Sequence, residues 1–210
     1  MPEYFDFDYL KEQVQVPIKG VVHIGAHYAE EAWEYNREGW QALWFEAHPD
    51  YVSNMFSNLD NYANQFGYNL CLSDVDEEEV TFWTTKDEYA SSMLKPAWHQ
   101  IQNPHAYING SIQLQTTRFD TWADSQEIDL SLYNLLVLDV QGSEDKVFRG
   151  MGDHVDKFDG LISEYSTVEF YENVPRLIDL DKLYGDKGFN RVYPDESNTL
   201  AHGDALYIRK

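Results

Sequence analysis

The sequence predicts an α/β fold in which a mostly parallel central sheet carries helices on both faces. Short apolar runs typical of buried strands recur along the chain, and the strongest lies at residues 135–140. Segments of helical composition separate these runs, and this alternation is typical of parallel strands joined by helices. The chain has no internal repeat, low-complexity tract or compositional boundary, so we expect a single domain over residues 1–210.

The first part of the chain predicts an N-terminal extension followed by alternating strands and helices. The extension, residues 1–20, contains an amphipathic helix at residues 4–13. The elements expected next are a strand at 21–24, a helix at 29–37, a strand at 42–45, a helix near 51–59, a strand near 68–72 and a strand at 80–85.

Residues 86–110 interrupt this regular pattern. They mix polar and aromatic side chains with two prolines and show no sustained periodicity, so we expect a long loop or short helices. Loops of this length often form lids over a substrate site. The side chains expected to line the acceptor side of such a site are Ser91, Ser92, Trp98 and His99.

Regular structure is predicted to resume after this loop. The expected strands are at residues 112–117, 135–140, 160–163, 189–193 and 205–208, and the expected helices are at 119–123, 144–148 and 175–184.

Composition and charge exclude several classes of partner. The chain has 15 Lys and Arg against 37 Asp and Glu, a net charge of −22, and no basic cluster for a phosphate backbone, so nucleic acid is not an expected substrate. No apolar run has membrane-spanning length and no signal-peptide pattern opens the chain, so we expect no membrane partner and a cytoplasmic location. The single cysteine, Cys71, lies in an apolar run and is interpreted as a buried structural thiol.

Ligands of parallel α/β sheets bind beyond the carboxyl ends of the strands, where the strand order reverses. The first strand is followed by Gly25, Ala26 and His27, a tight turn toward a helix N-terminus that favours a carboxylate or phosphate. Only Gly25 remains of a complete Gly-x-Gly-x-x-Gly pattern, so an ordinary strand-to-helix turn is an equally good interpretation.

Glu46 ends the next strand, 21 positions after Gly25. A carboxylate at this spacing accepts hydrogen bonds from a ribose diol in dinucleotide-binding folds. The alternative is a surface carboxylate in the turn before Pro49, and a nicotinamide cofactor would also suit this spacing.

Two carboxylates flank a glycine turn after the most apolar strand. Asp139 lies at the end of that strand and Glu144 follows Gly142. A charged group there needs polar partners or water, which a cleft would provide. Glu144 has a second interpretation, because acidic residues also favour the first turn of a helix.

Five motifs occur along the chain in an informative order. They are HIGAHYAEE at 23–31, WFEAHP at 44–49, LSD at 72–74, TRFDTW at 117–122 and LDVQGSE at 138–144. This order resembles the FkbM family of S-adenosylmethionine-dependent methyltransferases over roughly residues 21–171. The resemblance implies a Rossmann-like class I methyltransferase fold with a sheet of about seven strands.

The resemblance also implies S-adenosyl-L-methionine as cofactor, S-adenosyl-L-homocysteine as product, and methylation of a hydroxyl on a sugar or other small molecule. The implied cofactor residues are Gly25, Ala26, His27 and Glu30 at the methionine end, Glu46 at the ribose, Ser73 and Asp74 near adenine, and Asp139 beside the sulfur. Asp139 and Glu164 would face the methyl-transfer site.

Two positions depart from the family pattern. The first strand of family members commonly ends in an acidic residue where this chain has His23, and a small residue usually stands in place of His27. These differences concern the methionine end of the site more than the identity of the cofactor.

Methyl transfer to an unactivated hydroxyl requires a base to remove its proton. The candidate catalytic residues are Asp139, Glu144, Glu164 and His99, with His27 as a further candidate base. We expect the three carboxylates to converge in one cleft and to raise the pKa of at least one of them. They could instead bind a divalent ion, although no metal site is predicted. His23 and His27 have the i, i+4 spacing of metal ligands, but a path from a strand into a turn does not hold that geometry and no Cys/His cluster accompanies them. The histidines interpreted as surface residues are His48, His154 and His202.

Two other functions remain open from the sequence. A nicotinamide-dependent oxidoreductase or epimerase is disfavoured because the glycine pattern is incomplete and the chain has no Tyr-x-x-x-Lys pair. A catalytically silent nucleotide-binding module would share the same fold. The sequence does not indicate the oligomeric state.

Overall fold

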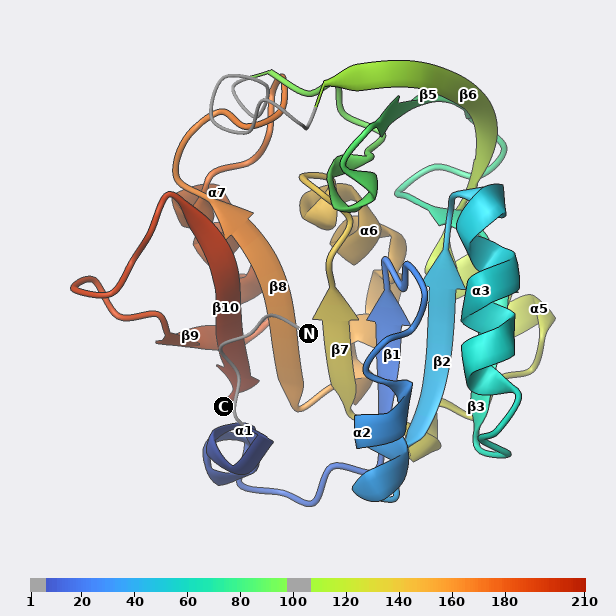
Figure 1. Cartoon of the computed structure of the whole chain (residues 1–210). Helices are drawn as coiled ribbons and strands as arrows, with labels where there is room; N and C mark the ends of the chain where they lie inside the picture. The colour runs from blue at the N-terminus through green and yellow to red at the C-terminus, as the bar shows by residue number, and fades with distance from the viewer. Residues whose placement is uncertain (1–6, 98–106) are drawn as a thin grey trace.

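A seven-stranded sheet in the order β3-β2-β1-β7-β8-β10-β9 forms the centre of the computed structural model, which describes residues 7–97 and 107–210 (Figure 1). The strands are β1 (Gly20–Ile24), β2 (Gln41–Glu46), β3 (Gln65–Asn69), β7 (Leu135–Leu138), β8 (Gly160–Ser166), β9 (Phe189–Tyr193) and β10 (His202–Arg209). All neighbouring pairs are parallel except those of β10, which runs antiparallel to β8 and β9. The predicted fold class, a mostly parallel sheet of the Rossmann-like type, is confirmed.

Helices cover both faces of the sheet (Figure 1). One face carries α1 (Phe7–Val14), α2 (Ala32–Arg37) and α3 (Pro49–Leu59), and the other carries α5 (Phe119–Ser125), α6 (Glu144–Gly150) and α7 (Leu177–Gly185). Side chains alternate between the two faces along each strand. In β7, Leu135 and Val137 pack with the first group of helices, whereas Leu136 and Leu138 pack with the second. Burial on both faces explains why these strands are continuous apolar runs.

A second, three-stranded sheet lies beyond the carboxyl ends of β1 and β2 (Figure 1). It consists of β4 (Cys71–Leu72), β6 (Ile108–Thr117) and β5 (Glu79–Thr85), in that order. The remaining regular elements are the 3-10 helices Glu88–Ala90, Leu130–Leu132 and Gly152–Lys157.

Three predicted boundaries are wrong for identifiable reasons. The strand expected near 68–72 is two strands, because β3 ends at Asn69 and β4 pairs with β6 of the second sheet. The strand expected at 112–117 begins already at Ile108, where antiparallel pairing with β5 extends it into the predicted loop. The helix expected at 29–37 begins at Ala32, because His27 and Ala29 have positive φ values of 47° and 55° and interrupt the helix.

His23, which departs from the family pattern, lies in the core beneath α2. Its Nδ1 is 3.1 Å from the Tyr35 hydroxyl oxygen, and its ring stacks on Trp44 with the centroids 4.6 Å apart. Burial lowers the pKa of His23 well below its ordinary value. We therefore assign this side chain a structural role as a neutral core residue.

The strand order reverses between β1 and β7, and the chain passes close to itself there. A Cβ atom on Gly25 would lie 1.8 Å from the Asp139 carbonyl oxygen, and Gly25 has a φ of 90°. Only glycine avoids this clash, so glycine is required at position 25, where the ends of β1 and β7 come close together. None of the described helices has both the length and the apolar character needed to cross a membrane.

Candidate active site

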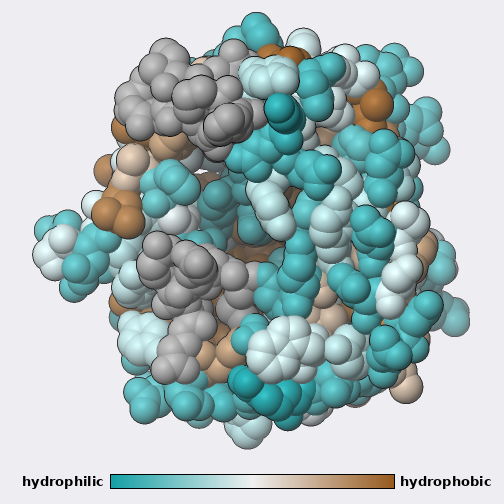
Figure 2. Space-filling model, viewed as in Figure 1, coloured by the Kyte–Doolittle hydropathy of each residue, from teal (hydrophilic) through white to brown (hydrophobic). Residues whose placement is uncertain are grey.

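A cavity opens at the carboxyl ends of β1, β2 and β7, at the point where the strand order reverses. Viewed as in Figure 1, Figure 2 shows the molecule hollowed near its centre, with hydrophobic residues deep in the hollow. The cavity is lined after β1 by Ile24, Gly25 and His27, after β2 by Phe45, Glu46 and Ala47, beside β4 by Leu70, Cys71 and Leu72, after β7 by Asp139, Val140, Gln141 and Ser143, and elsewhere by Tyr51, Phe82, Glu88, Tyr89, Ser91 and Met93. This is the location that a parallel α/β sheet predicts for a ligand.

Glu46 is a buried carboxylate at the end of β2, on the wall of the cavity. Its Oε2 accepts a hydrogen bond from the His27 backbone N–H at 2.8 Å, and its Oε1 accepts one from the His48 N–H at 2.6 Å. Burial raises the pKa of Glu46 to about 7, while these backbone donors act in the opposite direction. The side chain is therefore held in one orientation and is not a surface carboxylate.

The turn after β1 does not present free backbone donors to an anion. The N–H groups of Gly25 and Ala26 both donate to the Phe45 carbonyl oxygen at 2.9 Å, and that of His27 donates to Glu46. The expected helix N-terminus also begins later, at Ala32. Because β2 already satisfies these donors, the geometry favours the alternative interpretation, an ordinary turn after the strand.

His27 contributes a side chain to the cavity instead. Its Nδ1 lies 3.0 Å from Glu30 Oε1. Its buried Nε2 has no hydrogen-bond partner among the described residues, and Glu88 Oε2 lies 3.8 Å away, beyond hydrogen-bond distance. Glu30 does not line the cavity and contacts it through two lining residues, His27 and Tyr89. A buried unpaired nitrogen is costly unless a ligand satisfies it, so His27 Nε2 is a candidate ligand contact.

Contacts from the 3-10 helix Glu88–Ala90 reach across the cavity to the turn after β1. The Tyr28 hydroxyl donates to Glu88 Oε2 at 2.7 Å, and the Tyr89 hydroxyl donates to Glu30 Oε1 at 3.3 Å. Residues 88–91 of the predicted lid therefore lie at the same edge of the sheet as Asp139, around the same cavity.

The predicted lid residues have different environments. Ser91 lines the cavity, whereas Ser92 is fully buried and its hydroxyl donates to the Gln141 carbonyl oxygen at 2.7 Å. Trp98 and His99 lie outside the described residues.

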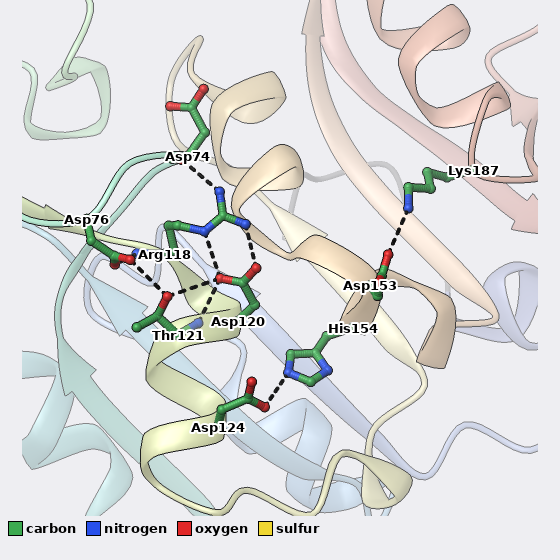
Figure 3. Close-up of polar contacts among 9 residues, drawn as sticks. All are labelled: Asp74, Asp76, Arg118, Asp120, Thr121, Asp124, Asp153, His154 and Lys187. Atoms are coloured by element: carbon green, nitrogen blue, oxygen red, sulfur yellow. Dashed lines mark hydrogen bonds and ion pairs between the residues drawn. The ribbon is translucent and has the colours of Figure 1, made fainter.

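Ser73 and Asp74 do not line the cavity, although residues 70–72 immediately before them do. Arg118 Nη1 donates to the Asp74 carbonyl oxygen at 2.8 Å, and Arg118 Nε donates to Asp120 Oδ1 at 2.9 Å (Figure 3). This Arg118 network ties residues 73 and 74 to α5. The structure therefore favours Leu70, Cys71 and Leu72 as the segment nearest a ligand in the cavity.

Asp139 and Glu164 are brought together by a residue that the sequence analysis did not single out. Gln141 Nε2 donates to Asp139 Oδ1 at 2.8 Å and to Glu164 Oε2 at 2.9 Å. Burial raises the pKa of Asp139, and burial together with the charges of Asp139, Glu144 and Asp204 raises the pKa of Glu164 well above its ordinary value. The prediction placed Glu164 just after the end of its strand, but Glu164 lies inside β8.

Glu144 is buried on the other side of this loop. Its Oε1 accepts hydrogen bonds from the backbone N–H groups of Val140 at 3.1 Å and Gly142 at 3.0 Å. Burial raises the pKa of Glu144 to about 8. Glu144 therefore holds the loop. Of the three carboxylates expected to converge in one cleft, Asp139 lines the cavity, whereas Glu144 and Glu164 lie behind its wall.

Asp204 is a further carboxylate that the sequence analysis missed. It lies on β10 opposite Glu164 in the strand register, and burial raises its pKa to about 8. The only signal in the sequence was its position one residue before the predicted strand at 205–208.

His48 is not the surface residue that its predicted turn suggested. Its side chain is buried and caps α3, because His48 Nδ1 accepts a hydrogen bond from the Asp50 N–H at 3.2 Å. His154 does lie near the surface, where its Nε2 is 2.8 Å from Asp124 Oδ1 (Figure 3). Across residues 7–97 and 107–210, no group of three or more His, Cys, Asp or Glu side chains has an arrangement that could hold a metal ion.

Replacing Glu144 with Gln is expected to stabilise the protein at alkaline pH. The Gln oxygen can still accept both backbone hydrogen bonds, but no charge is buried. Because the folded pKa of Glu144 is about 8 and lies above the unfolded value, its contribution to stability falls as the pH rises from about 4.5 to about 8. Thermal unfolding should give similar Tm values for variant and wild type at pH 5, and a Tm higher by roughly 2–6 °C for Glu144→Gln at pH 8.5. Equal differences at both pH values would contradict a buried charge at this position.

A family model described as the methyltransferase FkbM domain matches residues 23–190 of the chain. Over 85 residues the chain is 31% identical to the 2-O-methyltransferase NoeI of Sinorhizobium fredii, a match covering 40% of this chain and 34% of that protein. The aligned part is thus about a third of the length of that relative.

Solved structures of low sequence identity share the fold. Magnesium protoporphyrin IX methyltransferase (ChlM) from Synechocystis PCC 6803 with bound SAH has a TM-score of 0.52 at 11% identity, covering 97% of this chain and 79% of that one. The bifunctional kinase-methyltransferase WbdD also has a TM-score of 0.52, at 10% identity, covering 97% of this chain and 37% of that one. Because the family model spans most of the chain, the resemblance found in the sequence is confirmed, and this protein belongs to the FkbM methyltransferase family.

Proposed function

We propose that this protein transfers the methyl group of S-adenosyl-L-methionine to a hydroxyl of a sugar or other small molecule. The observation that carries the proposal is the cavity at the switch point of the sheet, which is lined by Glu46 from the end of β2 and by Asp139 from the end of β7. Membership of a methyltransferase family favours this function over the nicotinamide-dependent alternative.

The groups on the cavity wall suit the parts of S-adenosyl-L-methionine. Glu46 is an oriented carboxylate with lone pairs left for two ribose hydroxyls. Leu70 and Leu72 offer an apolar surface for adenine, and the unpaired His27 Nε2 offers a polar contact to the amino acid end. Asp139 adds negative charge that suits a sulfonium cation. When bound, the cofactor would supply a methyl group activated by the positive sulfur.

Asp139 is the proposed general base for the acceptor hydroxyl. It lines the cavity, and burial raises its pKa toward the range in which a carboxylate removes a proton effectively near neutral pH. Glu164 is the proposed second carboxylate, linked to Asp139 through Gln141. Because Glu164 does not line the cavity, Asp139 would hold the hydroxyl in line with the methyl group, and Glu164 would act on Asp139 through Gln141.

The acceptor is proposed to enter beside the segment that follows β5. The side chains of Glu88, Tyr89 and Ser91 line the cavity opposite the ends of β1 and β7. Aromatic faces, hydroxyls and carboxylates suit the C–H and O–H groups of a sugar ring. The name of NoeI, a 2-O-methyltransferase, supports the choice of a hydroxyl acceptor. The match to NoeI covers 40% of this chain.

Two measurements test this function. Titration calorimetry should detect binding of S-adenosyl-L-homocysteine and no binding of NAD⁺ under the same conditions. Incubation with S-adenosyl-L-methionine and a panel of mono- and oligosaccharides should then produce an acceptor heavier by one methyl group, detected by mass spectrometry. Binding of NAD⁺ alone would refute the cofactor, and cofactor binding without transfer to any hydroxyl would favour a silent binding module.

A further inference from the structure

Gln141 has an unusual set of contacts for a residue in a loop between a strand and a helix. Both hydrogens of its side-chain amide are used, one on Asp139 Oδ1 at 2.8 Å and one on Glu164 Oε2 at 2.9 Å. Its side-chain oxygen accepts a hydrogen bond from the Tyr171 hydroxyl at 2.8 Å. The two N–H groups of the amide therefore point toward two carboxylates, and its oxygen points toward a hydroxyl group that donates to it.

This orientation of the amide is the one that an ionised Asp139 requires. An ionised carboxylate only accepts hydrogen bonds. A flipped Gln141 would place its oxygen against Asp139 and Glu164 and would leave their facing oxygens without a donor. The Tyr171 hydroxyl, which also lies 3.2 Å from the Ala90 carbonyl oxygen, supplies the donor that the observed orientation needs.

The backbone of Gln141 is held as firmly as its side chain. Its φ of 57° is in the left-handed region, which is uncommon for a residue with a side chain. Its carbonyl oxygen accepts the Ser92 hydroxyl at 2.7 Å. The following residue, Gly142, donates its N–H to Glu144. Strained backbone of this kind persists where surrounding contacts enforce it, and it clusters at functional sites.

We infer that Gln141 is a positioning residue that holds Asp139 oriented toward the acceptor and keeps it separate from the carboxyl group of Glu164, which does not line the cavity. The inference rests on the proposed function. Without a donor between them, two neighbouring carboxylates would repel each other or share one proton. With the Gln141 amide between them, each carboxylate receives its own hydrogen bond, and Asp139 keeps its remaining lone pairs for the acceptor hydroxyl.

The other charged and titratable groups around the pair do not replace Gln141. Glu144 from α6 and Asp204 from β10 add negative charge beside Glu164, and His27 and Glu30 act on Asp139 from the turn after β1. The Tyr171 hydroxyl contacts the pair through Gln141. Among the described side chains that form hydrogen bonds here, Gln141 is the one that donates to both carboxylates.

Replacing Gln141 with Met tests the inference, because Met has a similar length but no donor. We expect kcat to fall about tenfold, the affinity for S-adenosyl-L-homocysteine to stay within twofold, and the lower midpoint of the pH–rate profile to rise by about one pH unit. Gln141→Glu has the shape of Gln but adds a third negative charge, so we expect a larger rise of the midpoint. If Gln141 only filled space, Gln141→Met would leave the midpoint unchanged.

A second measurement does not depend on turnover. The carboxyl ¹³C resonances of Asp139 and Glu164, assigned with Asp139→Asn and Glu164→Gln, should titrate at higher pH in Gln141→Met than in the wild type. If Gln141→Met does not fold, Tyr171→Phe is the second variant to test. It removes one hydroxyl and should move both midpoints in the same direction by a smaller amount. Unmoved midpoints in the folded variants would overturn the role of Gln141. Moved midpoints in a protein that shows no methyl transfer would support the role of Gln141 and refute the proposed function.

Discussion

Replacing Asp139 with Asn is expected to lower the rate of methyl transfer by roughly a hundredfold or more, the usual size of a positioned acid–base contribution. Asn keeps an oxygen that can accept the hydrogen bond which Gln141 now donates to Asp139 Oδ1. The loop after β7 should therefore keep its structure, and the affinity for S-adenosyl-L-homocysteine should change by less than about threefold. What Asn lacks is the ability to take the proton of the acceptor hydroxyl.

The matched control for this variant is Asp153→Asn. The Asp153 side chain is 99% exposed and lies 3.5 Å from Lys187 Nζ on the surface, away from the cavity (Figure 3). It should turn over at the wild-type rate. The wild-type rate should also rise with pH as Asp139 ionises, and this limb of the profile should be absent in Asp139→Asn. Wild-type turnover by Asp139→Asn would show that Asp139 is structural.

Replacing Glu46 with Ala is expected to weaken the binding of S-adenosyl-L-homocysteine at least tenfold. Hydrogen bonds to a charged acceptor contribute about 1.5–3 kcal/mol each, and a tenfold loss corresponds to about 1.4 kcal/mol. Titration calorimetry measures this change directly. Glu79→Ala is the control, because Glu79 is an exposed carboxylate on β5 that does not line the cavity. Unchanged affinity in a folded Glu46→Ala protein would remove Glu46 from the site.

The affinity should also depend on pH in a way that identifies Glu46. Burial raises its pKa to about 7, so part of the unliganded protein carries a neutral Glu46 at neutral pH. Ribose hydroxyls donate to the ionised form, so binding should tighten as the pH rises from 6 to 8 and should release protons near pH 6.5. In Glu46→Gln this dependence should disappear. A dependence that persists in Glu46→Gln would assign the titration to another group.

Much of the fold follows from patterns that are local in the sequence. Residues 135–138 are apolar throughout and form a strand that is buried on both faces, as a central parallel strand requires. The wrong boundaries have a different origin. The chain leaves the sheet after Asn69 because Cys71 and Leu72 pair with β6, more than 40 residues later. Strand pairing at this separation has no periodic signature along the sequence.

Some residues of the candidate site could likewise be identified from local sequence patterns, and others could not. Gly25 and Glu46 could be identified because their spacing reflects a βαβ unit, and Asp139 because a carboxylate after an apolar strand is chemically distinctive. Ser73 and Asp74 followed the family pattern, yet the contacts of Arg118 hold them away from the cavity. The path of the backbone at Asp74 depends on Arg118, a partner 44 residues away, which donates to the Asp74 carbonyl oxygen.

The sequence by itself determined the family, the order of most strands and helices, and the strand ends that carry the carboxylates. Only the tertiary structure revealed that Gln141 joins Asp139 to Glu164, that Asp204 lies beside Glu164, and that Glu144 supports the loop from behind. The physical reason is the distance along the chain. Gln141 is 23 residues from Glu164 and 30 from Tyr171, and a glutamine in a loop acquires a function only from the donors and acceptors that folding brings to it.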